Sequence, residues 1–275
     1  MTHPHHSAPT DVGTMYDQFS DVFSQAMGGN IHVGYWDSAD DPTTVEQATD
    51  RVTDMVADRL AAQPGQHLLD IGCGTGRPAT RIATRTQARI TGITISPHQL
   101  ERAQQTAQPA GDGGHVDFRF ADVMKLPFGD TTFDAAYAIE SLFHVPDRTV
   151  ALTEASRTVR PGGHLVVTDL LLRRPVTGAA KASMDAAAGI LQVANFTSPD
   201  DYRAQLAAAE WQLVEFDDIG EQVRRTYTHL IATLRGLRDS VPAELAGLVD
   251  QAVDAIGEFA TCPEVGYALI TARRA

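Results

Sequence analysis

Short apolar runs alternate with amphipathic segments between residues 66 and 173. The length of the runs and their content of β-branched and other apolar residues are typical of buried strands. The strand-like runs are HLLDI (67–71), RITGITI (89–95), VDFRFAD (116–122), FDAAYAI (133–139) and GHLVVTDLLL (163–172). Apolar residues at helical spacing predict helices over 76–86, 96–108 and 148–159. Because strands that alternate with helices form parallel βαβ units, the pattern predicts an α/β fold.

Further elements flank this central part. Apolar stripes predict helices over 14–27 and 42–62, separated by the glycine- and aromatic-rich stretch GGNIHVGYW (28–36). The segments predicted after residue 173 are Ala-rich helices within 178–209, a strand over 211–219, helices over 222–239 and 242–259, and a last strand over 266–274. We expect the N-terminal part and residues 174–260 to cover the open end of the sheet.

Charge and composition exclude several functions. The net charge of −13 over 275 residues argues against a nucleic-acid partner, which needs clustered Lys and Arg. No apolar run approaches the ~20 residues that span a membrane, and the N-terminus lacks the pattern of a signal peptide. Cys73 and Cys262 are too far apart in sequence for a metal-binding motif, and we expect His3, His5 and His6 to be solvated. We therefore expect a cytoplasmic protein without a membrane partner, a disulfide or a bound metal.

The stretch HLLDIGCGTGRPATRIA (67–83) places glycines directly after the first strand. Such a turn lets a ligand approach the backbone at the carboxyl end of the sheet. The dinucleotide pattern G-x-G-x-x-G fits at Gly72 and Gly74, but Arg77 occupies the third position. Thr94 stands where an acidic residue would hold the ribose of NAD. A nicotinamide cofactor is therefore the weaker interpretation.

Five segments resemble the motifs of class I S-adenosylmethionine-dependent methyltransferases. The first is DIGCGTG (70–76), whose spacing matches the first motif of that family. The others are GITISPHQ (92–99), ADVMKLPF (121–128), FDAAYAIESLFHVPD (133–147) and VRPGGHLVV (159–167). With NIHVGYW (30–36) and PEVGYALITARR (263–274), they narrow the resemblance to methyltransferases of bacterial natural-product biosynthesis, such as the rebeccamycin-type sugar O-methyltransferases and the rifamycin-type O-methyltransferases.

The resemblance implies a Rossmann-like sheet that is mostly parallel, with an antiparallel last strand, a helical N-terminal lid and a helical cap. The expected parts are a disordered tail (1–13), a lid helix and loop (14–42), a cofactor-binding core (43–173), a helical cap and acceptor region with the sixth strand (174–260) and the final strand of the sheet (261–275).

The implied cofactor is S-adenosyl-L-methionine, which leaves as S-adenosyl-L-homocysteine. In the resemblance Asp70 supports the glycine turn, and Gly72 and Gly74 lie against the cofactor. Asp122 and the backbone of Val123 hold the adenine, unless Asp122 only caps a helix. Thr94 and Gln99 hold the ribose through neutral hydrogen bonds, although Gln99 is alternatively a plain helix residue. Glu140 orders the cofactor or a loop.

The candidate catalytic residues follow two neighbouring strands. His144 comes after the fourth strand and Asp169 lies at the end of the fifth, so both are expected near the transferred methyl group. His144 would accept the proton of an acceptor hydroxyl, and Asp169 would orient the imidazole. Sugar-methylating relatives carry two successive histidines here, whereas this chain has Phe143 and His144. Phe143 favours a more apolar acceptor surface, and a purely structural role for His144 remains an alternative.

For the stretch NIHVGYW there are two interpretations. As a lid, Tyr35 and Trp36 would exclude water from the cofactor and the acceptor, and His32 would face the acceptor. Alternatively, the aromatic residues form a buried plug.

The preferred function is methyl transfer to a hydroxyl of a small-molecule acceptor, an antibiotic-type scaffold or its sugar. N- or C-methylation is the nearest alternative, because the acceptor atom leaves little trace in a sequence. An NAD-dependent oxidoreductase and a non-catalytic adenosylmethionine-binding protein are more remote alternatives.

Overall fold

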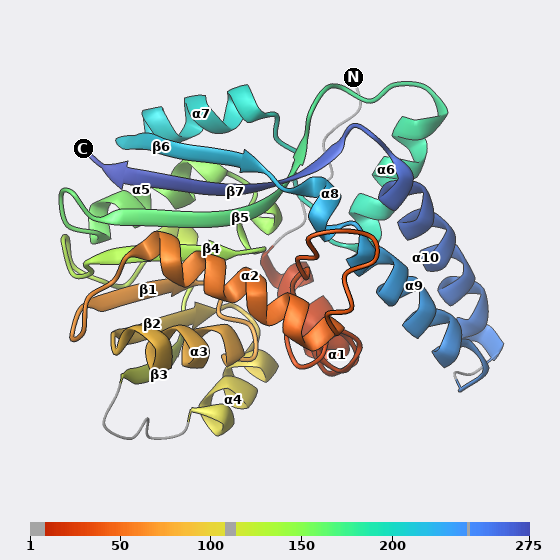
Figure 1. Cartoon of the computed structure of the whole chain (residues 1–275), viewed down its shortest axis with the longest axis horizontal. Coiled ribbons are helices and arrows are strands. Elements are labelled where there is room, and N and C mark those ends of the chain that lie inside the picture. Colours follow the sequence, from red (N-terminus) through yellow and green to blue (C-terminus); the bar gives the residue numbers. More distant parts are fainter. Residues whose placement is uncertain (1–8, 108–113, 241–242) are drawn as a thin grey trace.

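The computed structural model describes residues 9–107, 114–240 and 243–275, arranged around a seven-stranded sheet (Figure 1). The strands are β1 (His67–Ile71), β2 (Arg89–Thr94), β3 (His115–Phe120), β4 (Ala135–Ile139), β5 (His164–Leu172), β6 (Trp211–Asp218) and β7 (Val265–Arg274). The helices are α1 (Pro9–Ala26), α2 (Val45–Leu60), α3 (Arg77–Thr86), α4 (Pro97–Thr106), α5 (Arg148–Thr158), α6 (Ala179–Ile190), α7 (Pro199–Ala208), α8 (Gly220–Val223), α9 (Arg225–Leu237) and α10 (Ala243–Thr261), with short 3-10 helices η1 (Val123–Lys125), η2 (Leu142–His144) and η3 (Arg238–Ser240).

The strand order is β3-β2-β1-β4-β5-β7-β6. The pairs β1–β2, β2–β3, β1–β4 and β4–β5 are parallel, whereas β7 runs antiparallel to both β5 and β6. This confirms the predicted mostly parallel sheet with an antiparallel last strand. The chain winds outward in opposite directions from β1 and β4, and such a reversal leaves a crevice at the carboxyl ends of these two strands.

Two hydrophobic clusters cover the two faces of the sheet. Neighbouring residues of β1 point to opposite faces, so that Leu68 belongs to one cluster and Leu69 to the other. Buried residues of α2, α3 and α4 pack in the first cluster: Val56, Leu60, Ala79, Ile82 and Ala103. Buried residues of α5 and α7 pack in the second: Ala151, Leu152, Ala155, Tyr202 and Leu206. Burial on both faces explains why the parallel strands read as continuous apolar runs.

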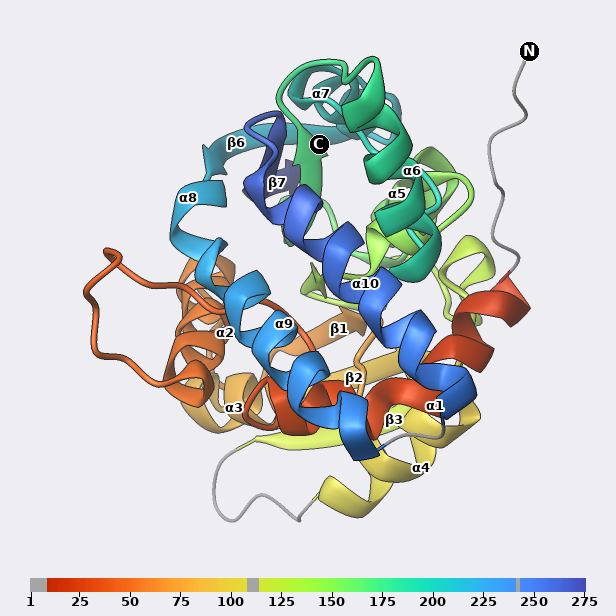
Figure 2. The same cartoon turned by 90° about the vertical axis from the view of Figure 1, so that its right-hand side faces the viewer.

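Helices α1, α6, α9 and α10 lie across the carboxyl ends of the parallel strands (Figure 2). Helix α10 contacts α6 and α9, and α1 contacts α4 and α9. Helices α1, α6, α9 and α10 therefore gather at one end of the sheet, over the crevice. None of the described helices is long and apolar enough to cross a membrane.

The N-terminal helix begins earlier than its hydrophobic pattern predicts. Residues 9–13 belong to α1, although they were expected in a disordered tail that ends at residue 13. Val12 is buried, so the first turns of this helix pack against the molecule. Residues 1–8, including the three histidines, lie outside the described residues.

Candidate active site

A cavity opens where β1, β2 and β4 end. Its lining includes eight predicted cofactor-binding residues: Asp70, Gly72, Gly74, Thr94, Gln99, Asp122, Val123 and Glu140. Residues of α1 close one side of the cavity, among them Val12 and Tyr16. We call this space the cofactor cavity.

The glycine turn after β1 forms the floor of the cofactor cavity. Gly72 has φ +81°, and a Cβ atom there would lie 2.4 Å from Cβ of Ser141. Gly74 has φ +53°, and its Cβ would lie 2.7 Å from Cδ1 of Ile31. Both positions therefore need glycine for backbone conformation and for close packing, as well as for access to a ligand.

Asp70 gives the cofactor cavity an acidic group. The residue is 2% exposed, and its Oδ2 has no hydrogen-bond partner among the described residues. Burial raises the pKa of Asp70 to about 7. A buried carboxylate oxygen without a partner costs free energy, so this atom is suited to a cationic or hydrogen-bond-donating group of a ligand.

The predicted ribose-binding residues connect the cavity to α1. Thr94 donates its hydroxyl proton to Oε1 of Gln99 (2.8 Å), and the side-chain amide of Gln99 donates to Ser20 of α1 (3.2 Å). One turn earlier in α1, Asp17 accepts hydrogen bonds from the hydroxyl of Ser96 and from a backbone N–H of α4. Helix α1 is thus fixed to the turn between β2 and α4, beside the cofactor cavity.

Asp122 lies between β3 and η1 at the edge of the same cavity. Its Oδ1 accepts a hydrogen bond from the backbone N–H of Met124 (2.9 Å), which caps η1. Asp122 and Val123 also line the cavity. Asp122 therefore caps η1, the role that the sequence left as an alternative. It also lies where it can bind a ligand.

A second cavity adjoins the first, and we call it the acceptor cavity. Its lining is mainly apolar: Met15, Met27, Ile31, Val33, Phe143, Leu170, Leu191 and Leu230. The polar and aromatic residues in its wall are Tyr16, His32, Glu140, His144, Thr226 and Tyr227. The two cavities share Tyr16, Ile31, Glu140 and His144, which therefore mark their junction.

His144 is held at both ring nitrogens. Its Nδ1 lies 2.9 Å from the carbonyl oxygen of Gln192, and its Nε2 lies 2.8 Å from the hydroxyl of Tyr16. A carbonyl only accepts, so Nδ1 carries the proton and Nε2 of the neutral ring accepts from Tyr16. Burial lowers the pKa of His144 to about 4, so the ring is neutral at pH 7.

Glu140 ties the loop before α2 to the sheet. Its Oε1 accepts from the backbone N–H of Val33 and from the hydroxyl of Tyr267, both at 2.8 Å. Glu140 has φ +51°, a conformation that costs energy for any residue other than glycine and often marks a functional site. Burial raises its pKa to about 7. The structure thus favours the loop-ordering role for this carboxyl group.

Asp169 does not lie beside His144, contrary to the sequence-based expectation. It is fully buried, accepts from Tyr202 (2.9 Å) and pairs with Arg148 (3.4 Å). Because side chains alternate along β5, the neighbouring Leu170 lines the acceptor cavity while Asp169 points to the opposite face of the sheet. Asp169 is therefore a structural residue.

Tyr35 and Trp36 also lie outside both cavities. The backbone N–H of Tyr35 donates to Ala48 of α2, and its ring packs against the hydrophobic core. Trp36 is 1% exposed, donates its indole N–H to Thr43 and stacks on His229. For these two residues the buried-plug interpretation is correct and the water-excluding one is wrong.

His32 and Phe143 do line the acceptor cavity, as predicted for substrate contacts. However, both nitrogens of His32 are bonded to protein groups, Nδ1 to the carbonyl of Val33 (2.9 Å) and Nε2 to Thr53 (3.1 Å). His32 is therefore suited to offer a ring surface to an acceptor, and polar recognition falls to other residues of the wall.

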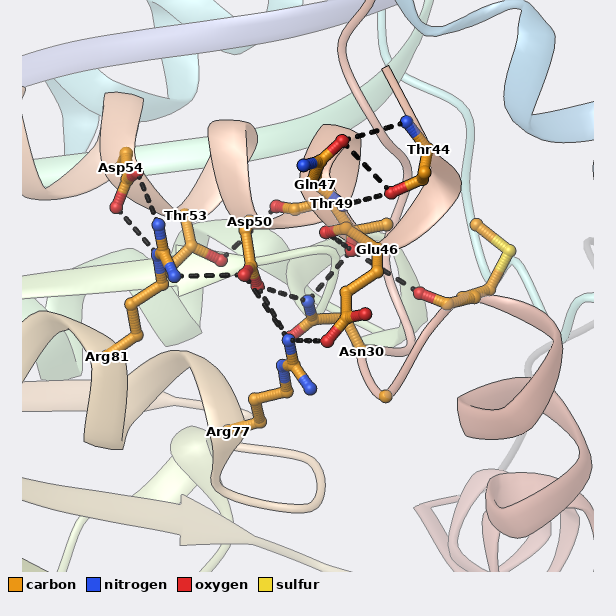
Figure 3. A network of polar contacts seen from close by, with 12 residues as sticks. Asn30, Thr44, Glu46, Gln47, Thr49, Asp50, Thr53, Asp54, Arg77 and Arg81 are labelled. Atoms are coloured by element: carbon orange, nitrogen blue, oxygen red, sulfur yellow. Dashed lines mark hydrogen bonds and ion pairs between the residues drawn. The ribbon is translucent and has the colours of Figure 1, made fainter. Parts of the chain in front are cut away.

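A network of ion pairs and hydrogen bonds holds the start of the segment 28–36 (Figure 3). Asp50 of α2 accepts from Asn30 (3.1 Å) and pairs with Arg77 (3.2 Å) and Arg81 (2.9 Å). Arg77 also pairs with Glu46 (2.8 Å). Arg77, which argued against a dinucleotide, thus points away from the cavity and helps to place the segment that carries Ile31 and Val33.

Sequence reasoning missed Tyr16, Ser141 and Tyr267. Tyr16 lies in the predicted lid helix, but it meets His144 only across 128 residues of sequence. Tyr267 is in the last strand and reaches Glu140 across 127 residues. No spacing rule relates such distant positions, so the sequence held no signal for these pairs.

Comparison with known proteins identifies the family. A family model described as a methyltransferase domain matches residues 69–167. The 27-O-demethylrifamycin SV methyltransferase of Amycolatopsis mediterranei (strain S699) is 38% identical over 278 residues, which cover 100% of this chain and 99% of that protein. The O-methyltransferase rstn1 of Aspergillus nomiae NRRL is 45% identical over 211 residues, 76% of this chain and 92% of the relative. The crystal structure of the [4+2]-cyclase SpnF superposes with a TM-score of 0.84 at 30% identity and covers 99% of both chains.

The cofactor cavity fits the cofactor of this family. The unpaired Oδ2 of Asp70 is suited to the amino group of a methionine moiety, and Thr94, Gln99 and Asp122 offer hydrogen bonds to a nucleoside. Gly72 and Gly74 line the cavity, so a ligand can lie against the backbone of the turn. This chain is also 38% identical to an O-methyltransferase over its full length. It therefore belongs to the class I S-adenosylmethionine-dependent methyltransferases, and S-adenosyl-L-methionine is its cofactor.

Proposed function

We propose that the protein methylates a hydroxyl group of a bulky, largely apolar secondary metabolite that binds in the acceptor cavity. The observation that carries this proposal is the junction of the two cavities. Tyr16, Ile31, Glu140 and His144 belong to both walls, so a ligand in one cavity meets a ligand in the other there. The names of the relatives support a hydroxyl as the methylated group.

Bound adenosylmethionine supplies a methyl group on a positively charged sulfur, so the leaving group needs no activation by the protein. The main task of the chain is alignment, which contributes up to ~7–11 kcal/mol in favourable intramolecular analogues. The walls shared by the two cavities provide this alignment. In our proposal α1 and the segment 28–36 form the lid, and helices α6, α9 and α10 form the cap that encloses the acceptor.

His144 is the proposed proton acceptor. The only nitrogen lone pair of the neutral ring is at Nε2, which accepts a hydrogen bond from Tyr16 at the junction of the two cavities. General-base assistance of this kind contributes roughly 10²–10⁴-fold to a rate. An alcohol needs such help because its oxygen loses a proton when it gains a methyl group.

The remaining cofactor contacts follow from the lining. We assign the adenine amino group to Asp122 and the ring edge to the backbone of Val123, with the ribose at Thr94 and Gln99. All four line the cofactor cavity. Asp70 is assigned to the amino group of the methionine part.

The free cysteines Cys73 and Cys262 are in keeping with a cytoplasmic enzyme.

The likeness to a [4+2]-cyclase raises a second use for the same cavities. A cycloaddition forms carbon–carbon bonds without moving a proton, so it has no need for a paired tyrosine and histidine. The bond between Tyr16 and His144 at the junction favours methyl transfer to a hydroxyl. A neutral amine attacks before it loses its proton and needs no base at that step, and the relatives are named for O-methylation, so we favour O-methylation over N- or C-methylation.

The test uses the full-length protein with adenosylmethionine and 27-O-demethylrifamycin SV, the acceptor implied by the name of the relative. The expected result is a product heavier by one methyl group, together with one equivalent of adenosylhomocysteine. Isotope-labelled methyl donor and NMR of the product identify the methylated atom. Calorimetric binding of adenosylhomocysteine without transfer to this or any other alcohol tested would instead favour a cyclase or a non-catalytic protein.

A further inference from the structure

Tyr16 and His144 line the acceptor cavity side by side and are hydrogen-bonded to each other. Its hydroxyl lies 2.8 Å from Nε2 of His144, and the two rings meet edge to face with centroids 5.4 Å apart. Tyr16 lines both cavities. The hydroxyl therefore occupies the only lone pair through which the neutral imidazole could take a proton.

The hydrogen bonds of His144 and Tyr16 have defined donors and acceptors. The proton on Nδ1 of His144 is directed to the carbonyl of Gln192, and the hydroxyl proton of Tyr16 is directed to Nε2. A phenol oxygen keeps lone pairs after it has donated its proton. Among the described residues no donor reaches the hydroxyl oxygen of Tyr16, so this oxygen can accept from a ligand in the acceptor cavity.

We propose that Tyr16 is a catalytic residue that relays the proton of the acceptor hydroxyl to His144. The inference rests on the methyl transfer proposed above. As the acceptor oxygen gains the methyl group, its O–H bond breaks and the proton passes to the hydroxyl oxygen of Tyr16. At the same time the original proton of Tyr16 moves to Nε2 of His144, and Tyr16 ends the step unchanged.

The charge of the site supports this relay. The positive charge on sulfur disappears in the step in which a positive charge forms on His144, so the buried junction keeps the same total charge. Glu140 lies at the same junction, and its ionised form would favour a cation there. Burial and Glu140 raise the pKa of Tyr16 above its ordinary value, so Tyr16 is protonated and passes a proton on without remaining ionised.

The relay also depends on the position of α1. Asp17 and Ser20, on the same helix, bond to Ser96 and Gln99 beside the cofactor cavity. Docking of α1 on the turn between β2 and α4 therefore sets Tyr16 against His144. In an open arrangement of α1, His144 would lack the relay.

The decisive variant is Tyr16→Phe, which removes the hydroxyl and keeps the ring. With adenosylmethionine and 27-O-demethylrifamycin SV, we expect kcat to fall about 10²-fold while the Kd for adenosylhomocysteine changes less than about threefold. The double variant Tyr16→Phe/His144→Asn is expected to be about as slow as either single variant, because the two residues act as a unit. Tyr35→Phe, which removes a hydroxyl outside both cavities, is the matched control.

Two further readouts separate a relay from a structural role. In water mixed with D2O, the wild type is expected to show a curved dependence of kcat on the deuterium fraction, because two protons move together. In the free protein labelled with 15N-histidine, Tyr16→Phe is expected to shift the Nε2 resonance of His144 and leave Nδ1 protonated. Normal or raised kcat in Tyr16→Phe, or losses that add in the double variant, would overturn the relay. Absence of transfer by the wild type would instead count against the proposed function.

Discussion

At the scale of single residues, burial decides which protonation states the site contains. Asp70 and Glu140 have their pKa raised to about 7, and His144 has its pKa lowered to about 4, in each case mainly because burial disfavours the charged form. The sequence placed Asp169 beside His144 to orient the imidazole. That expectation is wrong, because Asp169 points to the other face of the sheet, where it contacts Arg148 and Tyr202.

The first prediction concerns Asp70. Only its ionised form pairs with an ammonium group, and its pKa of about 7 means that it takes up a proton as the pH falls from 8 to 6. Affinity for adenosylhomocysteine is therefore expected to decrease with falling pH, by up to about tenfold per unit below the pKa. Asp70→Asn should weaken binding about 10–100-fold at pH 8 and flatten this dependence. Calorimetry across the pH range measures both effects, and Glu140→Gln, which should keep the slope, is the control.

The second prediction concerns His144. In His144→Asn the side-chain amide can still donate to Gln192, but the residue can no longer accept a proton. With a pKa of about 4, wild-type His144 is neutral throughout pH 6–9. The rate of methyl transfer is therefore expected to fall about 10²-fold or more at every pH in this range, with unchanged cofactor affinity. A loss limited to the acidic end of the range would show that another group is the proton acceptor.

At the scale of elements, the N-terminal helix and the turn before α4 close the cofactor cavity together. Helix α1 presents Val12 and Tyr16 to the cavity and bonds to the α4 turn through Asp17 and Ser20. Asp50 of α2 pairs with Arg77 and Arg81 of α3 and accepts a hydrogen bond from Asn30, which attaches the loop after α1 to these helices (Figure 3). Because Val12 belongs to the cavity wall, removal of residues 1–12 is expected to impair cofactor binding, whereas the hydrophobic pattern suggested a dispensable tail.

The third prediction concerns the docking of α1. Asp17→Ala removes the acceptor for the hydroxyl of Ser96 and for the N–H of His98. Loss of these bonds between α1 and the N-terminal turn of α4 should loosen α1. We therefore expect release of adenosylhomocysteine to be about five- to thirtyfold faster, which corresponds to ~1–2 kcal/mol. Stopped-flow displacement measures the release rate. Asp40→Ala, in the exposed loop 37–42, is the control. Equal release rates in the two variants would mean that α1 does not limit ligand exit.

At the scale of the whole molecule, a buried ion pair joins the core to the cap. Arg148 of α5 pairs with Asp169 of β5, bonds to Thr197 and donates to the carbonyl of Asn195 (3.3 Å). The same segment carries Gln192, whose carbonyl fixes the ring of His144. The pair thus stabilises the fold and the segment that orients His144, the proposed proton acceptor.

The fourth prediction concerns this pair. Asp169→Asn leaves the buried charge of Arg148 without its counter-charge, which typically costs ~3–5 kcal/mol of unfolding free energy. Urea denaturation should therefore show a much lower midpoint. Asp200→Asn, which breaks the pair between Arg203 and an aspartate that is 95% exposed, should change stability by less than about 1 kcal/mol. Combined replacement of both partners, Arg148→Met with Asp169→Leu, should recover most of the loss.

The sequence by itself determined the elements and the cofactor side of the site. Strand and helix patterns predicted every strand of the sheet to within two residues. The glycine turn was predicted at a ligand because it follows a strand at the carboxyl edge of the sheet. The resemblance to methyltransferase motifs assigned Thr94, Gln99 and Asp122 to the same cofactor, and all of them line the cofactor cavity. Local sequence motifs are sufficient for such residues, since each lies directly after its own strand.

Only the tertiary structure decided the acceptor side. Whether β5 turns Asp169 or Leu170 toward the cavity depends on which face of the sheet the cap covers, and a strand buried on both faces does not record this in its sequence. Tyr16 meets His144, and Tyr267 meets Glu140, because helices and strands more than 120 residues apart dock on one another. Trp36 lies in the core and not over the cofactor because α8 and α9 pack against its loop. These contacts arise from long-range packing, for which the local pattern of residues holds no information.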